Sequence, residues 1–204
     1  MLVTSYKAAC NRCLQPLAVA FARLRIAPSA ITFTGLALVL ASCLFVLLTK
    51  RVLAFCVFVT VASLFDALDG AVARASGRVT KLGAYLDALC DRYAEASIVL
   101  SVAIVTGYWA LSILVLTGAL LVSYAKARAA MEVSVSNLEW PDLMERTERG
   151  GLYLLGLAAS ALLPVKPLGH DLFWWTLVLL AVLIHGTVIQ RMRRASRLIQ
   201  ARSR

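Results

Sequence analysis

The stretch that decides the fold lies at residues 52–106, which read VLAFCVFVTVASLFDALDGAVARASGRVTKLGAYLDALCDRYAEASIVLSVAIVT. It opens and closes on apolar runs that approach the roughly 20 residues a membrane-spanning helix needs. Asp66 and Asp69 are three residues apart, and Asp87 and Asp91 are four apart, so each pair shares one face of a helix. The short segment between the pairs makes the two helices antiparallel neighbours. The stretch therefore predicts a helical hairpin whose acidic ends meet at one membrane face.

Composition extends this prediction to the whole chain. Of its 204 residues, 61% are hydrophobic and 16% are charged, and the mean hydropathy is +0.81. A soluble domain has roughly 45–50% apolar and about 25% charged residues. The net charge of +10 does not indicate nucleic-acid binding, because the basic residues flank apolar runs instead of lining one groove. The five cysteines lack the spacing of a zinc site and read as small apolar residues.

Six apolar runs predict an all-α integral membrane protein with six transmembrane helices. Residues 5–25 precede them and alternate basic and apolar positions, which is typical of an amphipathic helix in the membrane interface. We therefore expect one membrane domain over residues 1–204, with a juxtamembrane helix at 1–27 and a six-helix core at 28–194. The runs are Ala30–Thr49, Val52–Leu68, Ala84–Thr106, Tyr108–Tyr124, Gly151–Val165 and Leu172–Gln190.

The basic residues also predict an orientation. Of the 21 Lys and Arg residues, only Lys50, Arg51 and Lys166 fall on one side of the predicted spans. Because cytoplasmic loops carry the excess of Lys and Arg, both termini and the aspartates are expected on the cytoplasmic side. The expected location is the cell (plasma) membrane.

The four aspartates are costly in an apolar chain, and ionisable groups in membrane helices are functional by default. Four converging carboxylates cannot all stay ionised without cations. One or two Mg²⁺ ions would supply them, since Mg²⁺ prefers carboxylate oxygens and substrate phosphates, and Mn²⁺ is an alternative. A purely structural alternative is a hairpin that is salt-bridged by neighbouring basic residues, namely Arg74, Arg78, Lys81 and Arg92.

The motif Asp66-x2-Asp69-Gly70-x2-Ala73-Arg74-x8-Gly83-x3-Asp87-x3-Asp91 resembles the complete signature of the CDP-alcohol phosphatidyltransferase family. The resemblance extends to the six-span layout and implies an enzyme that joins a CDP-activated lipid to a small alcohol and releases CMP. It implies that Asp66, Asp69, Asp87 and Asp91 bind metal, with two ions in the site. It also implies that Asp91 is the general base.

The same resemblance implies residues that contact the CDP-lipid. Gly70 and Arg74 would contact the diphosphate or cytidine, and Thr80 would lie close to the nucleotide. The family often carries Pro-Asn-x-x-Thr before the first span, where this chain has Pro28-Ser29-Ala30-Ile31-Thr32. Thr32 would then bond the cytosine, while Ser29 stands in the usual Asn position.

The acceptor alcohol is indicated by residues near the fourth, fifth and sixth spans. Cations there suit an acceptor that carries its own phosphate. These stretches resemble the phosphatidylinositol-phosphate and archaetidylinositol-phosphate synthase branch, which implies myo-inositol 1-phosphate as acceptor and either diacylglycerol or archaeol as lipid. Positive-inside anchoring is the alternative reason for these cations. The implied residues are Ser123, Lys126, Arg146, Arg149 and Arg191, with Arg194 as the alternative to Arg191.

Other functions remain open at this stage. The same reaction with glycerol 3-phosphate or another small alcohol is one alternative, and a membrane transporter with an acidic ion site is a remote one. Transporter sites tend to lie at the membrane midplane between internal repeats, whereas these acids lie at one face and no repeat is visible. The family resemblance also implies a homodimer.

Overall fold

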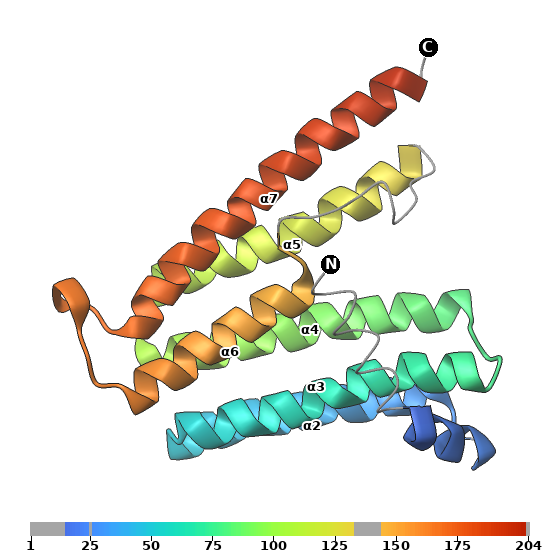
Figure 1. Ribbon diagram of the computed structural model, residues 1–204, viewed down its shortest axis with the longest axis horizontal. Coiled ribbons are helices and arrows are strands. Elements are labelled where there is room, and N and C mark those ends of the chain that lie inside the picture. The colour runs from blue at the N-terminus through green and yellow to red at the C-terminus, as the bar shows by residue number, and fades with distance from the viewer. Residues whose placement is uncertain (1–14, 25, 133–143, 203–204) are drawn as a thin grey trace. The chain divides into compact units, whose positions relative to one another are not determined.

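The computed structural model describes residues 15–24, 26–132 and 144–202, and in these ranges all regular structure is helical (Figure 1). Predictions for residues 1–14, 25, 133–143 and 203–204, including the Cys10 and Cys13 pair, lie outside the described residues. A short 3-10 helix, η2 (Pro167–Gly169), precedes the last helix. The long helices are α2 (Pro28–Thr49), α3 (Val52–Ala75), α4 (Lys81–Thr106), α5 (Trp109–Glu132), α6 (Arg146–Leu162) and α7 (Leu172–Arg202).

Four of the described helices are long and apolar enough to cross a membrane, namely α2, α3, α5 and α7. The all-helical, membrane-associated class is therefore confirmed. Between Lys81 and Glu95, α4 carries three acids and two basic residues, and α6 has only 17 residues, with Arg146, Glu148 and Arg149 in its first turn. The count of six spans stays a prediction.

The helices extend beyond the apolar runs. The second apolar run ends at Leu68, whereas α3 continues to Ala75, so Asp66 and Asp69 lie inside a continuous helix, as their spacing predicts. The extension has a local cause, because alternate alanines with high helix propensity follow Asp69. The helix ends just before Gly77, whose φ of +65° is open to glycine but strained for other residues.

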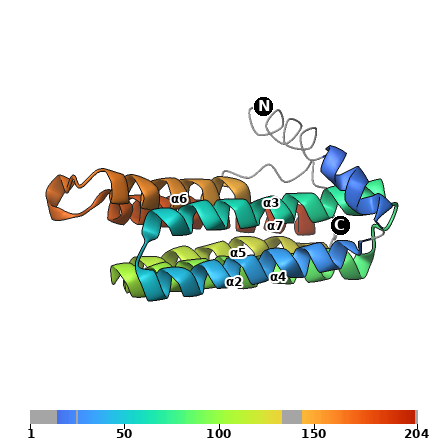
Figure 2. The ribbon, with the colours of Figure 1, turned by 90° about the horizontal axis from the view of Figure 1, so that it is seen from below.

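The chain forms two compact units, residues 1–105 and 106–204. In the first, α2 and α3 run side by side (Figure 2), and Gly35 allows their close approach. A Cβ at position 35 would lie 3.2 Å from the Cβ of Phe65. Buried Cys43 of α2 also forms a side-chain hydrogen bond with Ser101 of α4. Cys43, Cys56 and Cys90 are all buried and form no disulfide among the described residues, in keeping with their interpretation as small apolar residues.

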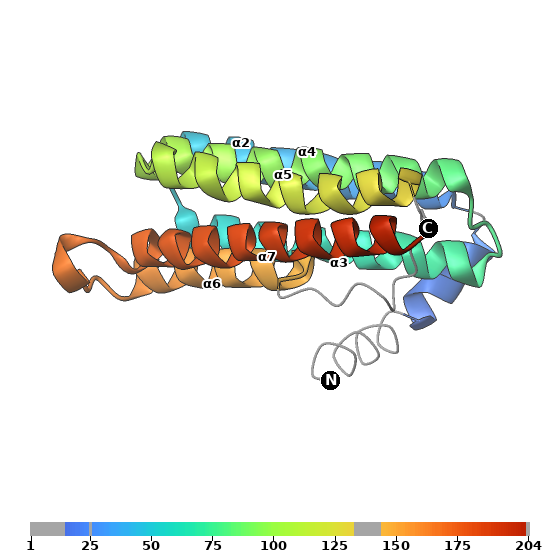
Figure 3. The ribbon, with the colours of Figure 1, turned by 90° about the horizontal axis from the view of Figure 1, so that it is seen from above.

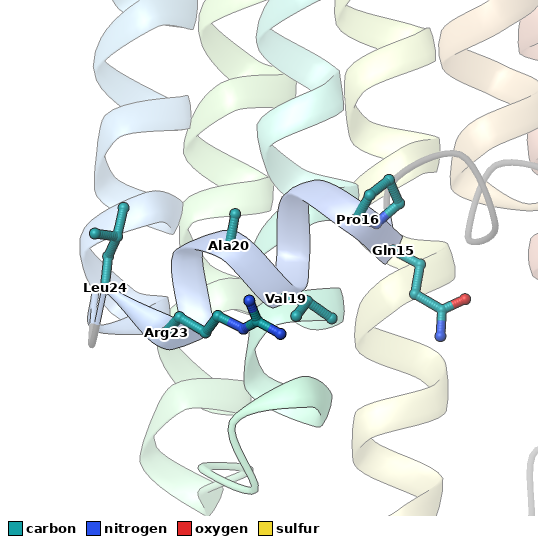
Figure 4. A pocket seen from close by; sticks show the side chains of 6 residues that line it. All are labelled: Gln15, Pro16, Val19, Ala20, Arg23 and Leu24. Atoms are coloured by element: carbon teal, nitrogen blue, oxygen red, sulfur yellow. The ribbon is translucent and has the colours of Figure 1, made fainter.

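Residues 15–23 form a helix at the end of α3 that carries the aspartates (Figure 4). Its buried Ala18 belongs to one cluster with Ile31 of α2 and Val72 of α3, and Phe21 packs against that cluster. This contact fixes the described helix against the first unit. Its place in a membrane interface stays a prediction.

In the second unit, α5 and α6 each pack against α7 (Figure 3). Glycines allow both contacts, since a Cβ at Gly118 would lie 2.7 Å from Ile184, and one at Gly156 would overlap the side chain of Thr176. Buried Tyr153 and Phe173 add an edge-to-face ring pair with centroids 5.2 Å apart.

Candidate active site

The acidic site is built from α3 and α4 within the first unit. Asp66 and Asp69 lie three residues apart on α3, and Asp87 and Asp91 lie one turn apart on α4. The start of α4 is fixed by Thr80, whose Oγ1 accepts a hydrogen bond of 2.9 Å from the backbone N–H of Gly83. A threonine in this position satisfies a backbone donor that the helix itself leaves without a partner.

The two helices bring three carboxylates together. Oxygens of Asp66, Asp87 and Asp91 all lie within 4.8 Å of one another, and the three residues are half-buried. This is the meeting of acidic faces that the spacing predicts. Three carboxylate oxygens at this separation suit a hard divalent cation, which accepts oxygen ligands and offsets their mutual repulsion.

Asp69 is distinct from these three because it is buried, with 5% of its surface exposed. Its carboxylate accepts a hydrogen bond of 2.5 Å from the hydroxyl of Thr32, which also lies 3.2 Å from the carbonyl oxygen of Pro28. The start of α2 is thereby joined to the acidic end of α3. Ser29 is three residues before Thr32 in the first turn of α2 and is half-buried.

Sequence reasoning missed the bond between Thr32 and Asp69, having given Thr32 only the nucleotide. The signal was present, because a polar residue at the start of the first span must lie at the same face as the end of the antiparallel second span. What the sequence did not specify was the rotation of α2, which decides whether Thr32 faces Asp69.

The basic residues around the aspartates play different parts. The guanidinium of Arg92 lies 3.1 Å from the carboxylate of Glu95 and 3.7 Å from that of Asp91. Arg92 thus supplies part of the positive charge that the salt-bridged hairpin requires. Arg74 folds back along α3, since a Cβ at Gly70 would lie 3.3 Å from its Nη1. Gly70 therefore leaves room for this guanidinium beside the acidic site.

The predicted acceptor residues all lie in the second unit. Ser123 and Lys126 are three residues apart on α5, and the Ser123 hydroxyl donates to the carbonyl of Ala119. Arg191 of α7 is buried and donates to the carbonyl of Val122, which places it against the same stretch of α5.

The start of α6 carries the other two predicted cations. A reciprocal capping box between Glu145 and Glu148 fixes this helix start, at which Arg146 and Arg149 lie. Arg149 is buried, and its Nη1 lies 3.4 Å from the carbonyl oxygen of Met144. The approach of these cations to the aspartates stays a prediction.

With this geometry in place, comparison with known proteins decides the family. The family model described as CDP-alcohol phosphatidyltransferase matches residues 25–185. The chain belongs to this family. Membership confirms the resemblance and assigns the reaction class, transfer from a CDP-activated alcohol, in place of the transporter alternative.

Several curated relatives are inositol phosphate synthases. The chain is 36% identical to an archaetidylinositol phosphate synthase of Pyrococcus horikoshii over 67% of its own length and 71% of the relative. It is 34% identical to a phosphatidylinositol phosphate synthase of Mycobacteroides abscessus over 87% of its own length and 80% of the relative.

Solved structures agree with the sequence matches. Phosphatidylinositol phosphate synthase of Mycobacterium tuberculosis with CDP-DAG bound has a TM-score of 0.77 and 28% identity, covering 90% of this chain and 94% of that one. The same enzyme in complex with manganese and citrate has a TM-score of 0.78 and 27% identity, covering 89% and 88%. The chain is thus a CDP-alcohol phosphatidyltransferase of phospholipid biosynthesis whose carboxylate cluster fits a divalent metal ion.

Proposed function

We propose that this enzyme transfers a phosphatidyl or archaetidyl group from a CDP-lipid to a hydroxyl of myo-inositol 1-phosphate and releases CMP. The observation that carries the acceptor is the similarity to inositol phosphate synthases over two thirds or more of the chain. These relatives include both archaetidyl and phosphatidyl enzymes, so the similarity favours the acceptor without choosing the lipid.

The proposed metal ligands are Asp66, Asp69, Asp87 and Asp91, holding two Mg²⁺ or Mn²⁺ ions. The mutual proximity of three of these carboxylates supports the proposal. When bound, the metal would neutralise diphosphate charge during in-line displacement. The bond between Thr32 and Asp69 would hold the fourth carboxylate in one orientation.

Asp91 is the proposed general base. The acceptor oxygen attacks the phosphorus that carries the lipid, the bond from that phosphorus to the CMP oxygen breaks, and the hydroxyl proton moves to the Asp91 carboxylate. A positioned base contributes about 10²–10⁴-fold to such a step. The Asp91 carboxylate lies 3.7 Å from the guanidinium of Arg92.

The proposed CDP-lipid contacts surround the aspartates. Arg74 would pair with the diphosphate, and Gly70 would let it approach the α3 backbone. Ser29 and Thr32 at the start of α2, with Thr80 before α4, would contact the nucleotide. The position of Thr32 beside Asp69 supports this grouping, because it joins the proposed nucleotide and metal contacts.

The proposed acceptor-phosphate contacts are Ser123, Lys126, Arg146, Arg149 and Arg191. The packing of α5 and α6 on α7, with Arg191 bonded beside Ser123, supports their grouping within the second unit. Guanidinium groups suit this task because they bind phosphate oxygens in bidentate fashion.

The membrane arrangement completes the proposal. Six spans behind an interfacial helix, with the active site and both termini on the cytoplasmic side of the plasma membrane, follow the distribution of basic residues. A homodimer is proposed from the family resemblance.

The test is an acceptor panel with purified full-length protein, CDP-diacylglycerol or CDP-archaeol, and Mg²⁺ or Mn²⁺. CMP release with inositol 1-phosphate should exceed that with glycerol 3-phosphate, serine or free inositol, and chelation should abolish it. Turnover with glycerol 3-phosphate but none with inositol 1-phosphate would overturn the acceptor while leaving the reaction class intact.

A further inference from the structure

Two adjoining grooves lie beside the helix of residues 15–23, and no proposed catalytic or substrate-binding residue lines either of them. The first, here the apolar groove, has a volume of about 750 Å³ (Figure 4). The second, here the basic groove, has a volume of about 340 Å³ and lies between that helix and the end of α3. Val19 and Arg23 line both, so the grooves adjoin. The apolar groove is lined by Gln15, Pro16, Val19, Ala20, Arg23 and Leu24, and the basic groove by Val19, Ala22, Arg23, Ala75, Ser76 and Arg78.

The basic groove is complementary to an anion. Arg23 and Arg78 are exposed, and neither forms an ion pair with a carboxylate of the described residues. No acidic residue lines either groove. Ser76 donates its hydroxyl to the carbonyl of Val72, so the two guanidinium groups are the donors this groove offers. Arginine pairs of this kind bind phosphate with charge-assisted hydrogen bonds.

The apolar groove is suited to the apolar part of the same ligand. Leu24 is 71% exposed and Val19 is 37% exposed, which is unfavourable in water but favourable against an acyl chain. Val19 and Arg23 are one helical turn apart, so the apolar surface continues directly into the charged one. An occupant with an apolar chain and an anionic head meets both requirements.

We propose that these grooves bind an anionic membrane phospholipid, with its phosphate between Arg23 and Arg78 and an acyl chain along Pro16, Val19 and Leu24. The groove lies at the end of α3, beyond the apolar part of that span, where lipid head groups are expected. Arg78 belongs to the connection between the two aspartate-bearing helices. The bound lipid thereby joins the first helix to the connection that positions α4.

A simpler role for the two arginines must be separated from this one. Arg23 lies in the last turn of the helix 15–23, and Arg78 follows closely on the end of α3. A cation in either position offsets the partial negative charge of the terminal carbonyls of a helix. That role would stabilise the protein equally in any lipid. Binding of an anionic lipid, by contrast, depends on the head group and on both arginines together.

The experiment measures lipid binding to the full-length protein in neutral detergent by native mass spectrometry. Phosphatidylglycerol is titrated against wild type, Arg23→Gln, Arg78→Gln and the double variant, with saturating CDP-lipid present to occupy the substrate site. Phosphatidylcholine and inorganic phosphate are the comparison ligands. Arg197→Gln is the matched control, because Arg197 is an exposed arginine of α7 that lines neither groove.

We expect each single variant to bind phosphatidylglycerol about fivefold more weakly, since an arginine near an anionic head group contributes about 1 kcal/mol. Arg197→Gln should bind like wild type, and CMP release should continue in every variant, which verifies folding independently of lipid binding. Equal binding of phosphatidylcholine, displacement by CDP-lipid or by millimolar phosphate, or unchanged affinity in the double variant would each overturn the proposal.

Discussion

The two units of the chain place their charged residues in different ways. In the first, half-buried carboxylates of Asp66, Asp87 and Asp91 converge on one another within 4.8 Å. In the second, the buried arginines Arg149 and Arg191 lie against backbone carbonyls. Like charges that converge gain nothing from one another and require a cation. Cations held by carbonyls are partly satisfied by the fold itself.

This difference predicts that substitutions in the two units will affect catalysis and stability differently. Removing one carboxylate from the acidic cluster relieves repulsion, so its cost should appear in catalysis and hardly in stability. Removing a buried arginine leaves a carbonyl without its donor, so its cost should appear in both. Lys126 is half-buried, whereas Arg149 and Arg191 are buried, so its replacement should change stability less than theirs and makes it the better probe for acceptor binding.

The largest expected effect is that of Asp91→Asn. The amide cannot accept the hydroxyl proton, and we expect kcat to fall by about 10²–10⁴-fold while the melting temperature holds or rises. CMP release and a thermal melt measure the two quantities.

The control for this change is Glu132→Gln. Glu132 is an exposed carboxylate that pairs with Arg128 on the last turn of α5, and such surface pairs contribute roughly 0.3–0.5 kcal/mol. It should leave kcat unchanged. A normal kcat in Asp91→Asn would show that Asp91 is not the general base. It would also contradict the expectation that losses in the acidic cluster appear in catalysis.

The next effect distinguishes Lys126→Met from Arg191→Met. A lost charge-assisted contact costs about 1.5–3 kcal/mol, so Lys126→Met should raise the KM for inositol 1-phosphate by roughly 10- to 100-fold, with a smaller change in melting temperature than Arg191→Met. Arg191→Met should raise that KM and also lower the melting temperature, because the Val122 carbonyl loses its side-chain donor and a buried contact is lost. Identical melting curves for both variants would show that the carbonyl contact contributes nothing to stability.

The acidic site could be predicted from sequence because its parts are local. Both aspartate pairs have helical spacing, and a connection of five residues, 76–80, joins their helices. Short connections and fixed periodicity leave few arrangements. The convergence of Asp66 with Asp87 and Asp91 follows from those two constraints.

The remaining features depend on packing that no local pattern encodes. The bond of Thr32 to Asp69 requires the rotation of α2 against α3, which is set by the contact of Gly35 with Phe65. The helix α3 continues past the end of its apolar run for a related reason. The length of an apolar run indicates how much of the chain transfers favourably into lipid. The length of the helix depends instead on helix propensity and on backbone hydrogen bonds, and both extend past the apolar residues.

A smaller effect is expected from Gly156→Ala, which probes the support of the second unit. The new Cβ would overlap Thr176, and overpacking of this kind costs about 1–3 kcal/mol. The melting temperature should fall, and activity should fall only in proportion to unfolded protein. Gly151→Ala on the same helix meets nothing within 4 Å and is the control. A melting temperature as high as that of the control would show that α6 and α7 can separate without loss.

The smallest effect concerns Tyr108, which lies in the connection before α5 and donates a hydrogen bond of 2.6 Å to Asp171. That bond, with burial and the negative charge of Asp171, raises the pKa of Tyr108 to about 12. The folded chain therefore keeps this proton to higher pH than the unfolded chain does, so its contribution to stability is complete below about pH 10 and is lost as pH rises toward 12. For a partly exposed pair it amounts to about 0.5 kcal/mol.

Thermal melts from pH 8 to 12 should show that wild type loses its small stability advantage over Tyr108→Phe in this window. Tyr85→Phe removes an exposed hydroxyl of α4 and should follow wild type throughout. A difference between wild type and Tyr108→Phe that does not change with pH would mean that the hydroxyl contributes through packing and not through its bond to Asp171.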